Sequence, residues 1–254
     1  MFNLQGKKGL VVGVANAQSI AFGCARAFKL CGAEVAITYI NEKAKQHVEP
    51  LAKMVAAPIF VPLDVEKDEE MDAVFATIEK EWGKLDFVVH SIAFAQKDDL
   101  HGRVVDCSRE GFARAMDISC HSFLRLAKRA EPLMTDGGAL ITMSYLGADE
   151  VIANYGIMGP VKSALQSATR YMASELGPKG IRVHAISPGP LLTRAASGIK
   201  EFDQLMEDAI ERSPMHKLVS SDDVGALCAY LVSDLAKSIT GGTIFIDGGY
   251  NVSH

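Results

Sequence analysis

The sequence predicts an α/β fold in which a doubly wound sheet of seven parallel strands carries helices on both faces. Short runs rich in β-branched residues alternate along the chain with longer segments of helical periodicity. These runs are apolar throughout, as expected for strands that are buried on both faces of a parallel sheet. No repeat or low-complexity linker divides residues 1–254, so we expect a single domain.

The first half of the chain contains four of the expected strands. Cys31–Gly32 stops the first helix, and Asn41 can cap the second. The third strand ends at Leu63–Asp64. The expected strands lie at 9–14, 33–39, 58–62 and 85–91, and the expected helices at 19–30, 41–54 and 67–82.

The second half continues the alternation with longer helices. One long helix is expected over 109–134, ahead of a strand at 138–144. A helix at 155–176 then leads to a strand at 180–186, and a helix at 222–233 precedes the last strand at 242–247. Right-handed crossovers between these strands produce a doubly wound sheet.

Residues 188–216 do not fit the alternation. They begin with Pro188-Gly189-Pro190 and contain a short amphipathic piece at 200–211. An insertion after the carboxyl end of a strand, where such sheets bind ligands, is typical of a substrate-covering flap. The alternative is one more surface helix.

The composition excludes several classes of protein. Apolar residues make up 48% of the 254 residues, and the 26 basic against 31 acidic residues give a net charge of −5, without the basic excess of nucleic-acid-binding proteins. No apolar run approaches the ~18 residues of a membrane span, and residues 1–8 lack a signal-peptide core. We therefore expect a cytoplasmic protein that binds neither nucleic acid nor membranes.

Cysteines and histidines form no recognisable metal or disulfide pattern. The five cysteines are scattered and never spaced C-x-x-C, which favours free thiols in a reducing compartment. The seven histidines contain no H-E-x-x-H pair, so no metal site is expected. His90 and His184 lie in expected strands, and we interpret both as packed, neutral side chains.

The loop after the first strand has the parts of a phosphate-binding turn, although it lacks G-x-G-x-x-G. Gly13 lets the backbone approach a pyrophosphate, and Ser19 can offer a hydroxyl at a helix start whose free N–H groups attract an anion. Any βα turn can contain such residues, so the pattern is weak alone.

Residues at the ends of the second and third strands could contact the nucleotide. Residues 38–41 contain neither an acid for a ribose diol nor an arginine for a 2′-phosphate, and Lys43 and Lys45 follow. The missing guanidinium favours NAD over NADP. Asp64 and Val65 could bind adenine, or Asp64 could cap the next helix.

Tyr155 and Lys162 are candidates for the chemistry. Seven residues on a helix make about two turns, with an offset of ~20° and a rise of ~10 Å, so both side chains would face one side. The ammonium would favour phenolate character, and the phenol could donate to a carbonyl that gains negative charge. The spacing by itself is unspecific.

Several stretches together carry a family resemblance. They are Gly13…Ser19-Ile20-Ala21-x-Gly23, His90-Ser91-Ile92-Ala93-Phe94-Ala95, Arg109-Glu110-Gly111-Phe112, Asp117-Ile118-Ser119, Ser144-Tyr145-Leu146-Gly147, Tyr155-x₆-Lys162, Gly189-Pro190…Ala195-Ala196-Ser197-Gly198-Ile199 and Asp247-Gly248-Gly249. In this order, across nearly the whole chain, they resemble the Rossmann-like short-chain dehydrogenase/reductase superfamily. Within it, the chain resembles the NADH-dependent enoyl-[acyl-carrier-protein] reductases of bacterial fatty-acid synthesis.

Position 158 separates this branch from ordinary members of the superfamily. Those carry tyrosine four residues before the lysine, where this chain has Met158 and places its phenol at Tyr155. The shift resembles the branch that reduces a carbon–carbon double bond rather than a ketone. An alcohol or ketone oxidoreductase, or a non-catalytic dinucleotide-binding paralogue, remains the alternative.

The resemblance implies roles for particular residues. NADH would deliver hydride to the β-carbon of a trans-2-enoyl thioester, Tyr155 would stabilise the enolate, Lys162 would hold the nicotinamide ribose, and Tyr145 would act at the site or shape the pocket. Ala95 would line the acyl pocket. The implied cofactor contacts are Gly13, Ser19, Ile20, Asp64, Val65, Ser91, Ile92, Lys162, Leu191, Leu192, Thr193, Arg194 and Ala195.

The resemblance also implies partners. The substrate would arrive on acyl carrier protein, and the chain would form a homotetramer. Ile40, at the adenosine end, departs from the polar residue frequent in relatives. Leu192, Arg194 and Asp203 depart from the basic pattern of the flap, although Lys200 remains.

Overall fold

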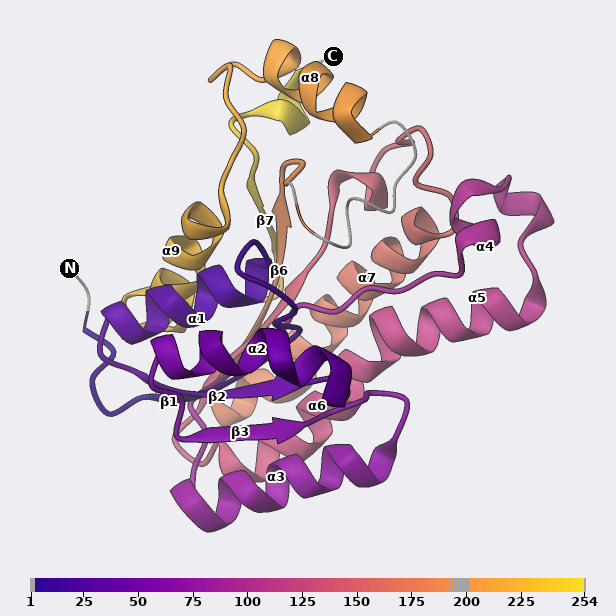
Figure 1. Ribbon diagram of the computed structural model, residues 1–254. Coiled ribbons are helices and arrows are strands. Elements are labelled where there is room, and N and C mark those ends of the chain that lie inside the picture. The colour runs from indigo at the N-terminus through magenta and orange to yellow at the C-terminus, as the bar shows by residue number, and fades with distance from the viewer. Residues whose placement is uncertain (1–2, 192, 194–201, 254) are drawn as a thin grey trace.

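The computed structural model describes residues 3–191, 193 and 202–253, and Figure 1 shows their arrangement. Its seven strands form one parallel sheet in the order β3-β2-β1-β4-β5-β6-β7. This confirms the predicted doubly wound sheet. The strands are β1 (Lys8–Val12), β2 (Glu34–Tyr39), β3 (Ile59–Pro62), β4 (Phe87–His90), β5 (Gly138–Met143), β6 (Ile181–Pro188) and β7 (Thr243–Ile246).

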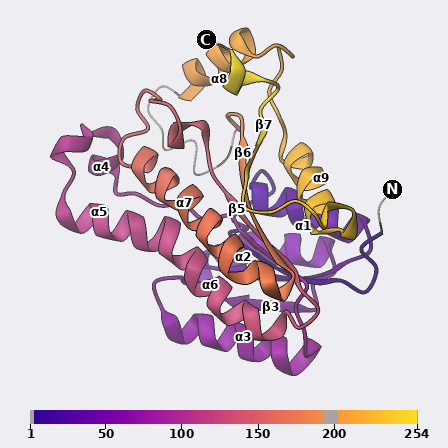
Figure 2. The same cartoon turned by 180° about the vertical axis from the view of Figure 1, so that it is seen from behind.

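Helices cover both faces of the sheet, as predicted (Figures 1 and 2). One core cluster joins the sheet to α3 (Asp68–Trp82), α6 (Ser122–Ala130) and α7 (Met158–Leu176). A second joins its other face to α1 (Ile20–Leu30), α2 (Glu42–Met54) and α9 (Ser221–Val232). Within β1, Leu10 and Val12 belong to the first cluster and Val11 to the second, so the apolar run fills both cores.

The strand order reverses between β1 and β4. Val12 is paired with His90, so these two strands end at the same level and the loops that follow them meet. Doubly wound sheets bind ligands at such a reversal, because the two loops diverge there and leave a crevice. The fold therefore places Gly13 and Ser91 side by side.

Two expected helices differ from the structure. The helix expected over 109–134 is divided into α5 (Arg109–Met116) and α6 by a π-helical turn at Asp117–His121, and it ends in a 3₁₀ turn at Glu131–Leu133. The helix expected from residue 155 begins only at Met158. Asn154 and Gly156 have φ angles of 60° and 49°, which are incompatible with a right-handed helix.

Two further helices lie at the carboxyl edge of the sheet, where the strands end. The short helix α4 (Lys97–His101), which was not predicted from the sequence, follows β4. The amphipathic piece of the flap forms α8 (Phe202–Arg212), close to the expected 200–211. Figures 1 and 2 show α8 above this edge, beside the C-terminus. None of the described helices combines the length and apolarity needed to cross a membrane.

Candidate active site

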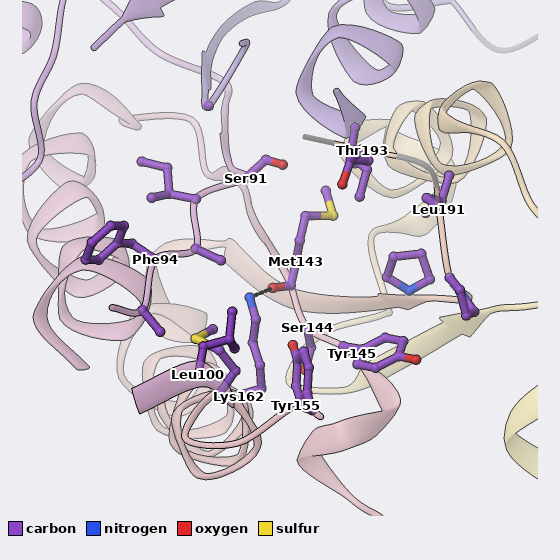
Figure 3. Close-up of a pocket in the computed structure, with 18 of the residues that line it drawn as sticks. Ser91, Phe94, Leu100, Met143, Ser144, Tyr145, Tyr155, Lys162, Leu191 and Thr193 are labelled. Carbon is purple, nitrogen blue, oxygen red and sulfur yellow. Dashed lines mark hydrogen bonds between the residues drawn. The ribbon is translucent and has the colours of Figure 1, made fainter. Parts of the chain in front are cut away.

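A cavity of about 1000 Å³ opens at the carboxyl edge of the sheet. Its lining extends from Gly13 after β1 to Leu205 on α8, so it runs from the strand reversal to the flap helix. Figure 3 shows the part around Lys162, Tyr155 and Tyr145. The predicted site residues that line it are Gly13, Ser19, Ile20, Ser91, Ile92, Ala95, Tyr145, Tyr155, Lys162, Leu191 and Thr193.

At the β1 end of the cavity, the backbone of Gly13 packs closely against the backbone of Ser91. Its φ is 107°, and a Cβ there would lie 2.1 Å from the carbonyl oxygen of Ser91. No side chain fits between the two loops, so peptide groups form the surface. A pyrophosphate can approach such a surface closely.

Ser19 stands at the start of α1 but does not cap it. Its hydroxyl donates to the carbonyl oxygen of Asn16 at 2.6 Å and lies 3.4 Å from the backbone nitrogen of Ala15, which donates to it. The first turn of α1 contains no acidic side chain. The helix N-terminus therefore keeps the positive potential that favours an anion.

Asp64 and Val65 do not line the cavity. Asp64 Oδ1 accepts from the backbone nitrogen of Glu66 at 3.1 Å, and the N-cap of α3 is Lys67. Capping by Asp64, the alternative considered from the sequence, is therefore wrong. Val65 is buried in the core cluster that contains α3.

The loop after β6 is described only in part. Leu191 is buried against the cavity, and Thr193 also lines it. The other predicted cofactor contacts in this loop, Leu192, Arg194 and Ala195, lie outside the described residues, as do Lys200 and the side chain of Asp203.

Tyr155 and Lys162 line the same cavity, although they do not share a helix. Lys162 belongs to α7, whereas Tyr155 lies in the turn before it. The expected placement of Tyr155 on the helix is therefore wrong, yet the turn brings its hydroxyl to the same space. In Figure 3 the Tyr155 hydroxyl and the Lys162 ammonium face this space, and the Tyr145 hydroxyl points away from it.

Both tyrosines remain protonated at neutral pH. Burial raises the pKa of Tyr155 far above its ordinary value, and neighbouring Tyr145 adds to the rise. Their rings pack edge to face with centroids 4.9 Å apart. A phenol in this setting is a hydrogen-bond donor, so the phenolate character expected for Tyr155 is wrong.

Lys162 carries a buried charge. Its side chain is only 4% exposed, and its Nζ donates to the carbonyl oxygen of Met143 at 2.5 Å. Burial lowers the pKa of the ammonium to about 8, so it is mostly protonated at pH 7. An ammonium has three N–H groups, and Met143 uses one of them.

A polar network lies beneath Lys162. His90 Nδ1 lies 2.9 Å from Thr142 Oγ1 and Nε2 lies 2.8 Å from Ser122 Oγ, whose proton goes to the carbonyl oxygen of Ile118. Nε2 is therefore the protonated ring nitrogen, and Nδ1 accepts from Thr142. Burial and the charge of Lys162 lower the pKa of His90 to about 3. The prediction of a packed, neutral His90 is confirmed.

Several residues of the cavity wall were not predicted as site residues from the sequence. Met143 and Ser144 line it at the carboxyl end of β5, and Met158 lines it at the start of α7. Their position at a strand end or one turn beyond Tyr155 could have identified them. Ser119, in the π-helical turn, acts indirectly: its hydroxyl accepts from the backbone nitrogen of Phe94 and donates to its carbonyl oxygen, at 2.8 and 3.0 Å.

Metal ligation has no structural basis in the described part of the chain. No group of three or more His, Cys, Asp or Glu side chains there is placed to hold an ion. Lys162 and Lys97 bring positive charge to the cavity lining, and side-chain hydroxyls such as that of Tyr155 bring hydrogen-bond donors. This arrangement can stabilise a developing oxyanion beside a bound nucleotide.

Comparisons with known proteins agree with this geometry. A family model described as enoyl-(acyl carrier protein) reductase matches residues 13–251. The chain is 46% identical over 248 residues to enoyl-[acyl-carrier-protein] reductase [NADH] 1 of Rhizobium meliloti, covering 98% of this chain and 91% of the relative. It is 45% identical over 251 residues to the corresponding NADH enzyme of Salmonella typhimurium, covering 98% and 96%.

Solved structures give the same result. The enoyl-acyl carrier protein reductase of Bacillus cereus, solved with NADP+ and indole naphthyridinone, superposes with a TM-score of 0.97 at 41% identity over 100% of both chains. The Anaplasma phagocytophilum enzyme, solved with NAD, superposes with a TM-score of 0.94 at 44% identity over 100% of this chain and 95% of the other. The chain belongs to the enoyl-(acyl carrier protein) reductase family.

Proposed function

We propose that this chain reduces the trans-2 double bond of an enoyl thioester on acyl carrier protein, with NADH as the hydride donor, in type II fatty-acid elongation. The proposal is supported above all by one observation: the Tyr155 phenol and the Lys162 ammonium face the same cavity. That cavity continues to a glycine-lined nucleotide end, in a chain 41–46% identical to curated NADH-dependent enoyl reductases.

The residues present fit a dinucleotide. Gly13 presents backbone without a side chain at this end of the cavity, and the N-terminus of α1 begins beside it without an acidic residue in its first turn. We assign the pyrophosphate to Gly13, Ser19 and Ile20, and the nicotinamide half to Ser91, Ile92, Lys162, Leu191 and Thr193. Asp64 and Val65 remain candidates for the adenine end, beyond this cavity.

Tyr155 is proposed as the oxyanion donor. When bound, NADH supplies a hydride to the β-carbon of the enoyl thioester. Negative charge then gathers on the thioester oxygen, and a neutral phenol with a raised pKa can donate to it without giving up its proton. Burial strengthens this hydrogen bond because little water competes for it.

Lys162 is proposed to hold the nicotinamide ribose and to keep the local field positive. One N–H is directed to Met143, which orients the ammonium and leaves its other donors for ribose hydroxyls. The positive charge also stabilises the enolate across the cavity. Protonation at the α-carbon completes the saturated thioester. For Tyr145, whose hydroxyl points away, the milder role of shaping the pocket through its ring fits better.

The end of β2 supports NADH rather than NADPH. Ile40 offers no cation to a 2′-phosphate, and Glu42, two residues later, brings a carboxylate that would repel one. Lys45 is already engaged, because its Nζ lies 3.4 Å from Glu42 Oε2 and 5.4 Å from the centre of the Tyr39 ring.

We further propose a cytoplasmic homotetramer. The five cysteines are free, and the sulfur atoms of Cys24 and Cys228 lie 3.4 Å apart as thiols, which supports a reducing compartment. Val104, Val105 and Phe112 are exposed apolar side chains near α5, and an interface between subunits could cover them. Light scattering of the purified protein tests the assembly, and cell fractionation tests the compartment.

The decisive experiment follows NADH absorbance with trans-2-enoyl thioesters on acyl carrier protein and on coenzyme A. We expect turnover with both carriers and a lower KM for NADH than for NADPH. Turnover of ketones or secondary alcohols without enoyl reduction would contradict the proposal. Tight NAD binding with no turnover of any enoyl thioester would also contradict it.

A further inference from the structure

The flap helix α8 rests on the C-terminal turn of the chain. Ala209 of α8, Leu146 and Tyr250 form a small buried cluster, separate from the two main cores. Leu146 directly follows Tyr145, and Tyr250 begins the 3₁₀ turn Tyr250–Val252. Figures 1 and 2 both show the C-terminus beside α8. Tyr250 therefore lies between the flap helix and the loop that carries Tyr145.

Arg212 joins the end of α8 to the same turn. Its Nη1 donates to Tyr250 Oη at 3.4 Å, and its guanidinium lies 4.8 Å from the centre of the Tyr250 ring. Its Nη2 donates to the carbonyl oxygen of Ser253 at 2.8 Å. Stacking on a ring and bonding to a carbonyl together orient a guanidinium. Arg212 thus connects the end of α8 to the Tyr250 ring.

The C-terminal turn is itself well anchored. Asp247, at the end of β7, accepts hydrogen bonds from the backbone nitrogens of Gly249 and Asn251 at 2.9 and 2.8 Å. Gly249 has φ of 89°, and a Cβ there would lie 2.9 Å from Pro214. Tyr250 is therefore a fixed support tied to the sheet, not part of a free tail.

The same stripe of α8 meets both Tyr250 and the cavity. Leu205, Ala209 and Arg212 are spaced by four and three residues, so they lie along one face of the helix. Leu205 lines the cavity, while Ala209 and Arg212 contact Tyr250. A displacement of α8 from Tyr250 would therefore move Leu205. Tyr250 also contributes to the raised pKa of Tyr145, after burial, which agrees with its closeness to the tyrosine loop.

We propose that Tyr250, clamped by Arg212, is a positioning residue that determines acyl-chain specificity by setting the place of Leu205 in the cavity wall. The proposal rests on the proposed enoyl reductase function. A four-carbon chain extends little beyond the reacting carbons beside Tyr155. A longer chain continues along the apolar wall and needs the part that the flap contributes. Loosening α8 should therefore harm long substrates more than short ones.

The test compares kcat/KM for four-carbon and twelve-carbon trans-2-enoyl thioesters. In Tyr250→Ala we expect the ratio of long-chain to short-chain kcat/KM to fall roughly tenfold, the scale of a lost apolar contact in a binding pocket. Arg212→Ala keeps the ring and should lower the ratio about two- to fivefold, as expected for one cation–π contact. Tyr250→Phe keeps ring and packing and should stay within about twofold.

Matched controls separate this effect from general destabilisation. Val252→Ala removes an exposed side chain from the same turn, and Arg170→Ala removes an exposed arginine from α7; both should leave the ratio unchanged. An equal fall for both chain lengths in Tyr250→Ala and Arg212→Ala would overturn the proposal. If Tyr250→Ala does not fold, Arg212→Ala still decides the question, because it preserves the buried cluster.

Hydrogen exchange gives a readout that does not depend on activity. Amides of residues 202–212 should exchange faster in Arg212→Ala and Tyr250→Ala than in the original chain, while those of α1 and α7 keep their rates. Unchanged exchange in α8 would refute the anchoring. If the original chain shows the expected exchange but reduces no enoyl thioester, the proposed function fails, and the specificity role fails with it. If the enzyme is active but the variants lose kcat/KM equally for short and long substrates, only the specificity role is refuted.

Discussion

The Lys162 ammonium donates a hydrogen bond to the carbonyl oxygen of Met143, at 2.5 Å, and so ties α7 to the end of β5. The contact holds a nearly buried charge at the point where β5 opens into the cavity. Burial lowers the pKa of this lysine to about 8. The site therefore depends on a group that is unfavourable for folding, and this leads to two predictions about pH.

The affinity for NADH should depend on the protonation of Lys162. Below pH 8 the ammonium can bind ribose hydroxyls, and above pH 8 it becomes a neutral amine. Kd for NADH, measured by fluorescence titration, should rise as pH increases through about 8. Lys162→Met should bind NADH weakly and without this rise. An unchanged Kd from pH 7 to pH 10 in the original chain would contradict the role.

Replacing Lys162 should stabilise the apo protein at neutral pH. Its pKa is about 8 when folded and 10.5 ordinarily, so between these values the unfolded chain binds the proton that the native protein has lost. Stability of the original chain therefore rises with pH across this window. Lys162→Met should have the larger free energy of unfolding, measured with urea, and its excess over the original chain should shrink by about 3 kcal/mol from pH 8 to pH 10.5. A constant difference would exclude the buried charge as its cause.

Tyr155→Phe should lower kcat by about 10²-fold or more, the scale of removing one charge-stabilising donor. The ring packing against Tyr145 is preserved, so the melting temperature and Kd for NADH should change little. Tyr171→Phe, on an exposed tyrosine of α7, is the matched control and should retain full turnover. Normal turnover by Tyr155→Phe would remove this tyrosine from the chemistry.

Gly13→Ala should disturb both folding and nucleotide binding. The new Cβ would meet the Ser91 carbonyl at 2.1 Å in a backbone with φ of 107°. Strain and overpacking together should destabilise the protein by roughly 2–4 kcal/mol and weaken NADH binding more than about tenfold. Gly177→Ala meets open space and should lie within about 0.5 kcal/mol of the original chain. Equal behaviour of the two variants would show that the loops can separate freely.

Ser119→Ala should disturb the wall of the acyl pocket indirectly, through the backbone of Phe94. Both backbone groups of Phe94 would lose their hydrogen-bond partner, which costs about 1–3 kcal/mol of unfolding free energy. Because Ala95 follows Phe94, KM for the enoyl thioester should rise more than kcat falls. Thr77→Ala loses an exposed hydroxyl bond on α3 and is the control. A fall in kcat alone would argue against a positioning role for Ser119.

Much of the fold could be predicted from local pattern. Apolar runs located all seven strands, because a strand buried on both faces must be apolar at every position. Asn41 was identified as an N-cap, and its side chain does accept from the backbone nitrogen of Ala44 at 2.9 Å. The short helix α4 escaped prediction because five residues are too few to show a helical period.

The candidate site was predicted in its residue types but not in its geometry. The motifs located Tyr155 and Lys162, whereas the turn that presents Tyr155 depends on positive φ angles at Asn154 and Gly156 that periodicity does not reveal. Asp64 was misjudged as a possible cap for a similar reason. A side-chain hydrogen bond to Glu66 competes with capping, and only coordinates distinguish the two.

The sequence by itself determined the order of strands and helices, the family and the chemical groups available for catalysis, because these follow from local periodicity and from the residue types at each position. Only the tertiary structure decided which groups meet. Arg212 and Tyr250, 38 residues apart, come together because α8 packs against the C-terminal turn that follows β7. The charge of Lys162 and the neutral state of Tyr155 depend on burial, which arises when distant segments pack together.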